Sequence, residues 1–274
     1  MDAALGEFLD YLRGHAVEFG IADGLHRCED HDGPLSIGAG GRHEFRLSGH
    51  EPVIEYRDPQ SALAADHASQ GVALAMLRNR CVQPGDRFFD IGCGTGVLAV
   101  VGARMGAIEL VLTDVVPEAL LLARRTLEEA GVEAEYYPGS LLSGIPEGRQ
   151  ADVIAANLPH KPVPDGIYLT SSQNGGPEGD SIHGAFIPQA LQHLAPGGRV
   201  YFFMHSLPHP RLLRLYQQHF RLRLLAWRRR FLQPGEYGEL QEMFVERSRA
   251  GTSFVGEAHG RRYLVAGVWE ATLQ

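Results

Sequence analysis

The stretch Asp90-Ile91-Gly92-Cys93-Gly94-Thr95-Gly96 decides the fold, because it joins a strand to a helix through closely spaced glycines. Phe88 and Phe89 before it predict a short buried strand, and residues 95–105 predict a helix that ends at Gly106. Glycine has no Cβ, so the backbone turns sharply and a ligand can lie close to it. The spacing is G-x-G-x-G, not the G-x-G-x-x-G of dinucleotide-binding folds. The stretch indicates a ligand-binding loop, and the alternative is a tight turn without a ligand.

The same order of strand, loop and helix recurs along the chain. Further strands are expected at 109–114, 134–137, 152–156 and 200–204. Strands that alternate with helices in this way predict an α/β fold, with a mostly parallel sheet and helices on both of its faces. Segments 222–227 and 263–269 are expected to close the sheet, with an insertion at about 232–260 between them.

Residues 1–57 are expected to form a small N-terminal module, and residues 58–274 the main domain. Leu5, Phe8 and Leu12 recur at helical spacing, so the module opens with an amphipathic helix. Alternating apolar residues on both sides of a turn at 48–52 predict a hairpin. The module is too small to build a large core by itself, so we expect it to pack on the main domain.

The composition is that of a globular protein in a reducing compartment. The 274 residues contain no run of 18 or more apolar residues, so no membrane span is expected. The chain opens with Met1-Asp2 and without a basic flank, so no signal peptide is expected. Three cysteines lie far apart, which argues against a disulfide scaffold. These features predict a cytoplasmic protein and leave its oligomeric state unknown.

The formal net charge of −8 makes a nucleic-acid partner unlikely, because such partners usually require a basic face. One segment departs from this balance. Residues 211–230 carry seven arginines and no acidic residue. The segment is interpreted as a solvated face, and the alternative is a docking patch for an anionic substrate or partner.

Asp114 ends the second predicted strand. In nucleotide-binding α/β folds, an acidic residue at this place accepts hydrogen bonds from the ribose hydroxyls. The other interpretation is a helix-capping aspartate before Pro117. We expect the ribose role.

The glycine stretch resembles motif I of class I S-adenosylmethionine-dependent methyltransferases. The resemblance covers roughly residues 60–274 and implies a Rossmann-like sheet of seven strands, with the last strand antiparallel. It implies S-adenosylmethionine as the cofactor and Asp90 as the residue that orders the loop and the methionine amino group. The residues implied to line the cofactor are Gly92, Cys93, Gly94, Gly96, Asp114 and Asn157.

One position departs from that family. Its members often have Asp in a Gly-Asp pair after the third strand, where the carboxylate holds the adenine amino group. This chain has Gly139-Ser140-Leu141. Ser140 is therefore expected to make that contact through its hydroxyl.

Asn157-Leu158-Pro159-His160 follows the fourth predicted strand and resembles the Asn-Pro-Pro-Tyr type motif of methyltransferases that act on nitrogen, release-factor glutamine methyltransferases among them. The Asn157 side-chain oxygen and the Leu158 carbonyl can each accept an N–H of one nitrogen, which leaves its lone pair aimed at the methyl group. Pro159 stiffens the loop. The alternative is a proline-containing loop that merely ends a strand.

The next two residues are candidate substrate contacts. His160 stands where the family has a larger aromatic residue, and it can take a proton near neutral pH, which suits a substrate nitrogen that loses one. The alternative is a histidine that stacks on the substrate or only packs in the loop. Lys161 is the single lysine of the chain. Its compact ammonium suits a substrate carboxylate, and the alternative is an exposed loop lysine.

The segment 174–180 loosely resembles a Gly-Gly-x-Asp-Gly segment of release-factor methyltransferases and is expected to border the substrate mouth. Glu178 is a candidate for binding a cationic substrate, and Asp180 is expected to cap the following helix. His26, Cys28 and His31 lie close in sequence, but no second ligand pair follows, so no metal site is expected.

The sequence thus predicts an N-methyltransferase. The first hypothesis for its acceptor is a small amine, amino acid or azole, and the alternative is a protein or peptide side chain. An RNA acceptor is disfavoured by the net charge. A non-catalytic cofactor-binding scaffold is disfavoured by the intact Asn157 motif.

Overall fold

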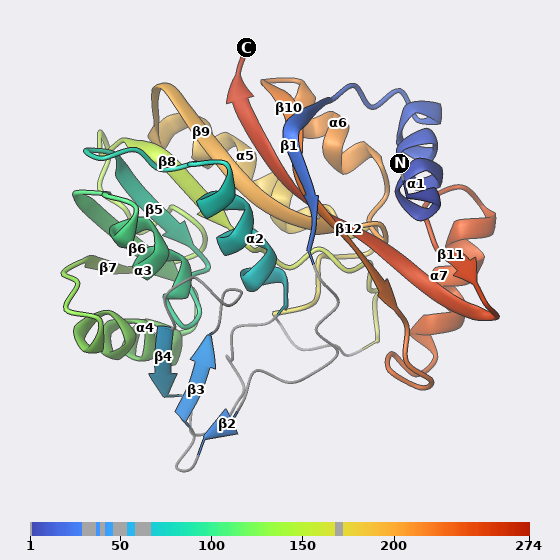
Figure 1. The fold of residues 1–274 in the computed structure, drawn as a ribbon, viewed down its shortest axis with the longest axis horizontal. Helices are drawn as coiled ribbons and strands as arrows, with labels where there is room; N and C mark the ends of the chain where they lie inside the picture. Colours follow the sequence, from blue (N-terminus) through green and yellow to red (C-terminus); the bar gives the residue numbers. More distant parts are fainter. Residues whose placement is uncertain (1, 29–36, 39–41, 46–53, 58–66, 168–171) are drawn as a thin grey trace.

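The computed structural model describes residues 2–28, 37–38, 42–45, 54–57, 67–167 and 172–274. A single large sheet runs through the molecule, with the strand order β1-β10-β12-β9-β8-β5-β6-β7 and with β11 paired to β12 (Figure 1). Its strands are β1 (Gly20–Arg27), β5 (Arg87–Ile91), β6 (Glu109–Asp114), β7 (Glu135–Pro138), β8 (Ala151–Ala156), β9 (Leu194–His205), β10 (Phe220–Phe231), β11 (Gly256–Ala258) and β12 (Arg261–Leu273).

Most neighbouring strands of this sheet are parallel. The pairs of β5 with β6 and β8, of β6 with β7, and of β8 with β9 are all parallel, whereas β12 runs antiparallel between β9 and β10. The predicted Rossmann-like arrangement and its antiparallel closing strand are confirmed. The sheet also has strands beyond the seven expected, since β1 pairs in parallel with the edge of β10 and β11 extends the insertion.

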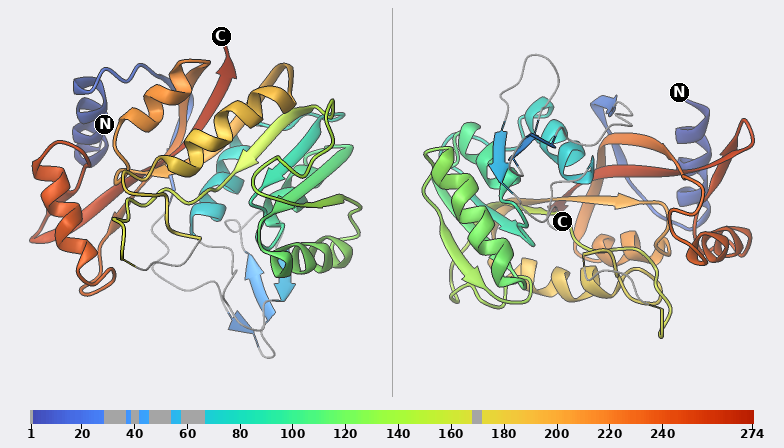
Figure 2. Two further views of the ribbon diagram at one scale, coloured as in Figure 1. Left: turned by 180° about the vertical axis from the view of Figure 1, so that it is seen from behind. Right: turned by 90° about the horizontal axis from the view of Figure 1, so that it is seen from below.

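Helices cover both faces of the sheet, as predicted (Figure 2). They are α1 (Ala3–Gly14), α2 (His67–Arg78), α3 (Val97–Arg104), α4 (Pro117–Glu129), α5 (Ser181–His193), α6 (Arg211–Gln217) and α7 (Leu240–Arg249). The expected helix signals mark α4, because Pro117 is its first residue and Gly131 follows its end with a positive φ of 69°.

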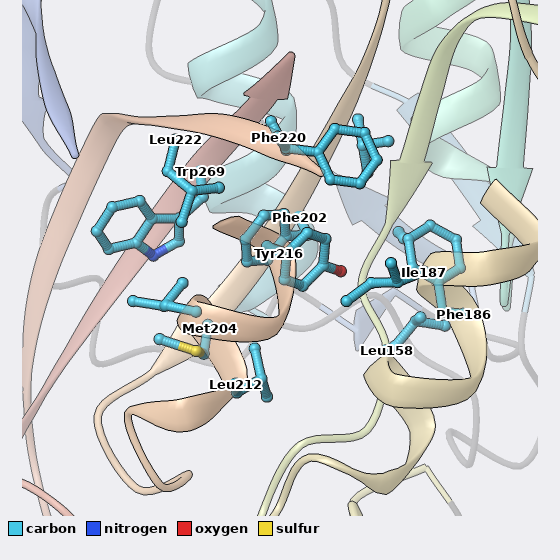
Figure 3. Packing of buried hydrophobic residues seen from close by; sticks show 14 of the residues in the cluster. Leu158, Phe186, Ile187, Phe202, Met204, Leu212, Tyr216, Phe220, Leu222 and Trp269 are labelled. Carbon is cyan, nitrogen blue, oxygen red and sulfur yellow. The ribbon is translucent and has the colours of Figure 1, made fainter. Parts of the chain in front are cut away.

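Two apolar cores lie on opposite faces of the sheet. Successive strand residues point to opposite faces; accordingly Phe88 joins the core under α2, α3 and α4, whereas Phe89 joins the core under α1, α5 and α6. In the second core Tyr216 of α6 stacks on Phe202 of β9 with 4.2 Å between the ring centroids (Figure 3). Burial on both faces explains why the central strands are nearly continuous apolar runs.

The N-terminal residues divide between two places. Helix α1 buries Leu5, Phe8 and Leu12 as predicted and packs beside β10 and β12, and β1 is an edge strand of the main sheet. The strands β2 (Ile37–Gly38), β3 (Arg42–Phe45) and β4 (Ile54–Arg57) form a separate small sheet, and β4 lies next to α4. The predicted hairpin is present as the antiparallel pair of β3 and β4. Its turn at 48–52 lies outside the described residues.

The insertion after β10 contains α7 and β11. Its core consists of Leu207, Leu232, Leu240, Phe244 and Leu264. Because β12 is antiparallel to β9, the start of β12 lies beside the carboxyl end of β9. The insertion therefore lies near the carboxyl ends of the parallel strands, where ligands bind in open α/β sheets.

Candidate functional site

The loop between β5 and α3 has a backbone conformation that would be strained with any residue other than glycine at three of its positions. Gly92, Gly94 and Gly96 have φ values of 67°, 51° and 76°, in the left-handed region that favours glycine. A Cβ on Gly96 would lie 2.8 Å from Leu127 Cδ1 of α4, and one on Gly92 would lie 3.2 Å from Leu158 Cδ2. The loop is therefore closely packed between α4 and the Asn157 motif, which brings two predicted parts of the site together.

Asp90 lies beneath this loop with 1% of its surface exposed. Its Oδ2 accepts a hydrogen bond from the Ala99 backbone N–H of α3 at 3.2 Å. Burial raises the pKa of Asp90 well above its usual value, and the charge of Asp114 adds to the rise. The side chain thus fastens the loop to the first turn of α3, in keeping with the expected ordering role.

Asp114 connects the glycine loop to the loop after β6. Its Oδ2 accepts from the Gly94 N–H at 3.0 Å, and its Oδ1 accepts from the Val116 N–H at 2.9 Å. A carboxylate has about four acceptor positions, so these two bonds leave capacity for hydroxyl donors. Val116, not Asp114, occupies the N-cap position of α4.

Cys93 and Ser140 lie beside Asp114 at the same edge of the sheet. The Cys93 N–H donates to the Thr113 carbonyl at 2.9 Å, and the Gly139 N–H donates to the Asp114 carbonyl at 3.1 Å. Cys93 is buried and Ser140 is exposed. Val115 is an apolar side chain with 68% exposure at this edge. Sequence reasoning missed it, although its place directly after Asp114 was a usable signal.

Asn157 directly follows β8, and its side chain contacts α2. Its Nδ2 donates to Ser69 Oγ at 3.2 Å. Ser69 is the second residue that sequence reasoning missed. Nothing in the local pattern of residues 67–78 distinguishes this serine from an ordinary helix residue.

His160 is 6% exposed and has protein partners for both ring nitrogens. The His205 backbone N–H donates to Nε2 at 3.2 Å, so Nε2 is the acceptor and the ring proton is on Nδ1. Nδ1 then donates to the Leu158 carbonyl at 2.6 Å. The histidine ties the Leu158 carbonyl to the end of β9, as in the loop-packing alternative, and a role toward the substrate stays a prediction.

Two further buried histidines surround His160. The ring centroids of His205 and His183 lie 4.1 Å and 5.9 Å from that of His160. Burial lowers the pKa of His183 to about 3 and lowers that of His205 well below its usual value. Both are therefore neutral, and His183 Nδ1 lies 2.8 Å from the Tyr216 hydroxyl.

The segment 174–180 packs directly against the Asn157 motif. The Lys161 backbone forms an isolated parallel β-bridge with Asn174, and a Cβ on Gly175 would lie 2.6 Å from His160 Cα. The Lys161 ammonium lies 5.4 Å from the centroid of the Tyr237 ring, in the insertion. Lys161 is thus placed between the motif and the insertion, and its proposed contact with a substrate carboxylate stays a prediction.

Glu178 and Asp180 each form an ion pair with an arginine of this chain. The Arg247 guanidinium of α7 donates to both Glu178 oxygens, at 2.7 Å and 3.4 Å, and this pairing lowers the pKa of Glu178. Asp180 occupies the N-cap position of α5 but makes no capping bond and pairs with Arg211 instead. The predicted side-chain cap by Asp180 is wrong, since its carboxylate pairs with Arg211 instead. Glu178 already has a cationic partner in Arg247, and its role toward a cationic substrate stays a prediction.

The arginines of residues 211–230 are mostly bound to this chain itself. Arg211, Arg223 and Arg230 pair with acidic residues, and Arg214 donates to the His15 carbonyl at 2.8 Å. Three of the seven charges are thus balanced by acidic residues of this chain, and the docking patch for an anionic partner stays an untested alternative. Among the three residues considered above for a metal site, His31 lies outside the described residues. Across the described ranges, no group of three or more potential metal ligands gathers, and no helix is long and apolar enough to cross a membrane.

Residues 61–231 match the family model for the methyltransferase small domain. The ribosomal protein L11 methyltransferase of Pelotomaculum thermopropionicum is 35% identical over 158 residues, which are 57% of this chain and 44% of that protein. The release factor glutamine methyltransferase of Deinococcus radiodurans is 30% identical over 189 residues, which are 66% of this chain and 63% of that protein. Each of these alignments leaves more than a third of the relative unmatched.

Solved structures share the fold at lower identity. The 16S rRNA N2 G1207 methyltransferase of T. thermophilus, in complex with AdoMet and guanosine, has a TM-score of 0.53 at 20% identity and covers 85% of this chain and 50% of its own. The tRNA m1G37 methyltransferase of M. jannaschii has a TM-score of 0.51 at 13% identity, over 86% of this chain and 56% of its own. At these identities the similarity concerns the fold alone.

Proposed function

Since this chain belongs to the methyltransferase small domain family and is an S-adenosylmethionine-dependent methyltransferase, we propose that it methylates a nitrogen atom. The observation that carries the proposal is the position of Asn157. Its carboxamide follows β8 at the carboxyl edge of the sheet, and the adjoining Leu158 side chain is 3.2 Å from the position of a Cβ on Gly92. The acceptor motif and the glycine loop are thus in direct contact.

The residues present fit the cofactor. The loop of Gly92, Cys93, Gly94 and Gly96 presents backbone without bulky side chains, Asp114 retains acceptor capacity for ribose hydroxyls, and Ser140 lies exposed beside it. When bound, S-adenosylmethionine supplies a methyl group on a positively charged sulfur. We propose that Asp90 holds this loop in shape through its bond to Ala99.

The acceptors of the Asn157 motif suit a nitrogen nucleophile. The Asn157 oxygen accepts a hydrogen bond from one substrate N–H. One lone pair of the Leu158 carbonyl accepts the hydrogen bond from His160 Nδ1–H, and its other lone pair accepts a second substrate N–H. Two accepted bonds fix the direction of the nitrogen lone pair. They also stabilise the positive charge that develops on nitrogen, and this charge grows toward the transition state. Pro159 stiffens the connection between these acceptors and His160.

For the acceptor, the first candidate is a nitrogen of a protein or peptide side chain. It is supported by the two relatives described above, whose names are those of protein methyltransferases. The second candidate is a small amine, amino acid or azole. It stays a candidate because the L11 relative has 56% of its length outside the match, so its protein substrate does not carry over to this chain by similarity alone. A cytoplasmic location suits either acceptor.

The test is an incubation of the purified chain with radiolabelled S-adenosylmethionine and a fractionated bacterial extract. Label in protein supports the first candidate, and label in small molecules supports the second. Label that elutes as O-methyl or C-methyl product would refute nitrogen transfer. With the acceptor identified, Asn157→Ala is expected to lower kcat on the order of 10²–10³-fold, as for other preorganised polar groups, with little change in cofactor affinity. Near-normal turnover would contradict the proposed role of Asn157.

The cofactor contacts have a separate test. Asp114→Ala is expected to weaken S-adenosylmethionine binding by about 1–3 kcal/mol, because hydrogen bonds to a charged carboxylate are lost. Isothermal titration calorimetry measures this change without an acceptor. Unchanged affinity would show that the ribose does not lie at Asp114.

A further inference from the structure

Ser69 lies in the first turn of α2, 88 residues before Asn157 in the chain, and makes a side-chain contact with the acceptor motif. The Asn157 amide nitrogen is the donor and the Ser69 hydroxyl oxygen is the acceptor, at 3.2 Å. The contact joins α2 to the loop after β8.

The direction of this bond matters because a carboxamide has two chemically opposite ends. The oxygen accepts hydrogen bonds and the nitrogen donates them, yet the two ends have nearly the same shape. The last side-chain torsion of asparagine is broad and roughly two-fold, so shape alone does not select one orientation. In the flipped orientation Asn157 would present N–H groups to a substrate that also offers N–H groups. A partner for Nδ2 therefore decides whether the acceptor end faces the substrate.

The helix that carries Ser69 is well placed to make this selection. Val72, Ala75 and Met76 of α2 are fully buried, and α2 packs on α3 and on β9, β10 and β12. A short serine side chain on a firmly packed helix holds its hydroxyl more closely than a side chain on a loop would.

We propose that Ser69 is a positioning residue that turns the Asn157 carboxamide oxygen toward the substrate nitrogen. The inference rests on the proposed function, because it assigns Ser69 a role in nitrogen transfer. It also makes a statement about the free protein, namely that one Asn157 amide proton is bound to Ser69 before any substrate arrives. That statement can be tested without knowing the acceptor.

The first experiment is nuclear magnetic resonance of the full chain with ¹⁵N-labelled asparagine side chains. The chain contains only three asparagines, Asn79, Asn157 and Asn174, so only three amide pairs appear, and Asn157→Ala identifies its own. Ser69→Ala is expected to shift the Asn157 pair and to speed its exchange with water, while the other pairs stay in place. Alanine is a strong helix former, so the helix is retained. An Asn157 pair that does not respond to Ser69→Ala overturns the proposal.

The second experiment uses the acceptor identified by radiolabelling. Ser69→Ala is expected to lower kcat about 3- to 10-fold, the rate equivalent of one neutral hydrogen bond, with unchanged cofactor affinity. Ser69→Thr keeps a hydroxyl and is expected to restore most of the rate. The matched control is Asn79→Ala, which removes a side-chain bond to the Ala75 carbonyl at the other end of the same helix and is expected to leave kcat unchanged.

The two proposals fail in different ways. If Asn157→Ala abolishes turnover but Ser69→Ala retains the full rate, the positioning role is wrong and nitrogen transfer stands. If Asn157→Ala retains the full rate, the nitrogen-orienting function is wrong, and a kinetic role for Ser69 is overturned with it. A loss of rate in Ser69→Ala that Ser69→Thr does not restore also overturns the positioning role.

Discussion

Replacing His160 by phenylalanine distinguishes a loop anchor from a catalytic base. Phenylalanine keeps an aromatic ring beside Phe203, whose centroid lies 5.8 Å from that of His160. It removes the acceptor of the His205 N–H and the donor to the Leu158 carbonyl, two bonds of 3.2 Å and 2.6 Å. A buried polar group left without a partner costs about 1–3 kcal/mol. The Leu158 carbonyl borders the proposed substrate site, where water can replace the lost donor, so most of the cost falls on the His205 N–H.

We therefore expect His160→Phe to lose about 2 kcal/mol of stability, which for a chain of this size lowers Tm by about 3–4 °C. Differential scanning calorimetry of the free protein measures this shift. Turnover is expected to fall because the Leu158 carbonyl loses its fixed direction, but the shape of the pH–rate profile is expected to stay the same. His193→Phe is the control, since it removes one bond, to the Arg149 carbonyl at 2.8 Å, outside the site. It is expected to lower Tm without lowering turnover.

Two results would refute this reasoning. An unchanged Tm in His160→Phe would show that its ring bonds do not hold the loop. A variant that loses only the acidic limb of the pH–rate profile would show that His160 acts as a general base after all.

Three other changes test separate parts of the structure. Gly96→Ala is expected to destabilise the protein by about 1–3 kcal/mol, because the left-handed backbone and the 2.8 Å approach to Leu127 exclude a Cβ; an unchanged urea midpoint would contradict this. Arg247→Ala is expected to cost less than about 1 kcal/mol, since its pair with Glu178 is partly exposed, but to lower turnover by loosening segment 174–180; full turnover would separate this pair from the site. Acid is expected to destabilise the protein through His183, whose pKa is lowered to about 3 by burial. The unfolded chain, with a histidine pKa of about 6.5, then binds more protons, so the free energy of unfolding falls as pH drops below about 6.5, by up to about 1.4 kcal/mol per pH unit. In urea titrations at pH 7 and pH 5, His183→Leu is expected to show a smaller fall than the parent chain, and equal falls would contradict it.

The sequence by itself determined the fold class and the positions of the ligand loops. The glycines of residues 92–96, Asp114 at a strand end and Asn157 at another are local signals, read from a few neighbouring residues. Parallel strands that alternate with helices have their carboxyl ends at one edge of the sheet. In the structure the Leu158 side chain packs against Gly92 at this edge.

Only the tertiary structure decided which of those side chains already have partners. His160 is hydrogen-bonded to His205, which lies 45 residues away in the sequence. The partner of Glu178, Arg247, lies 69 residues away, and the partner of Asn157, Ser69, lies 88 residues away. Edge strand β1 likewise pairs with β10, far along the chain. Such contacts leave no mark on local periodicity, because they arise when separate elements pack on both faces of one sheet. A polar residue in a sequence motif looks available for a ligand, and the packing of distant elements decides whether its charge or its ring nitrogens are already bound within the chain.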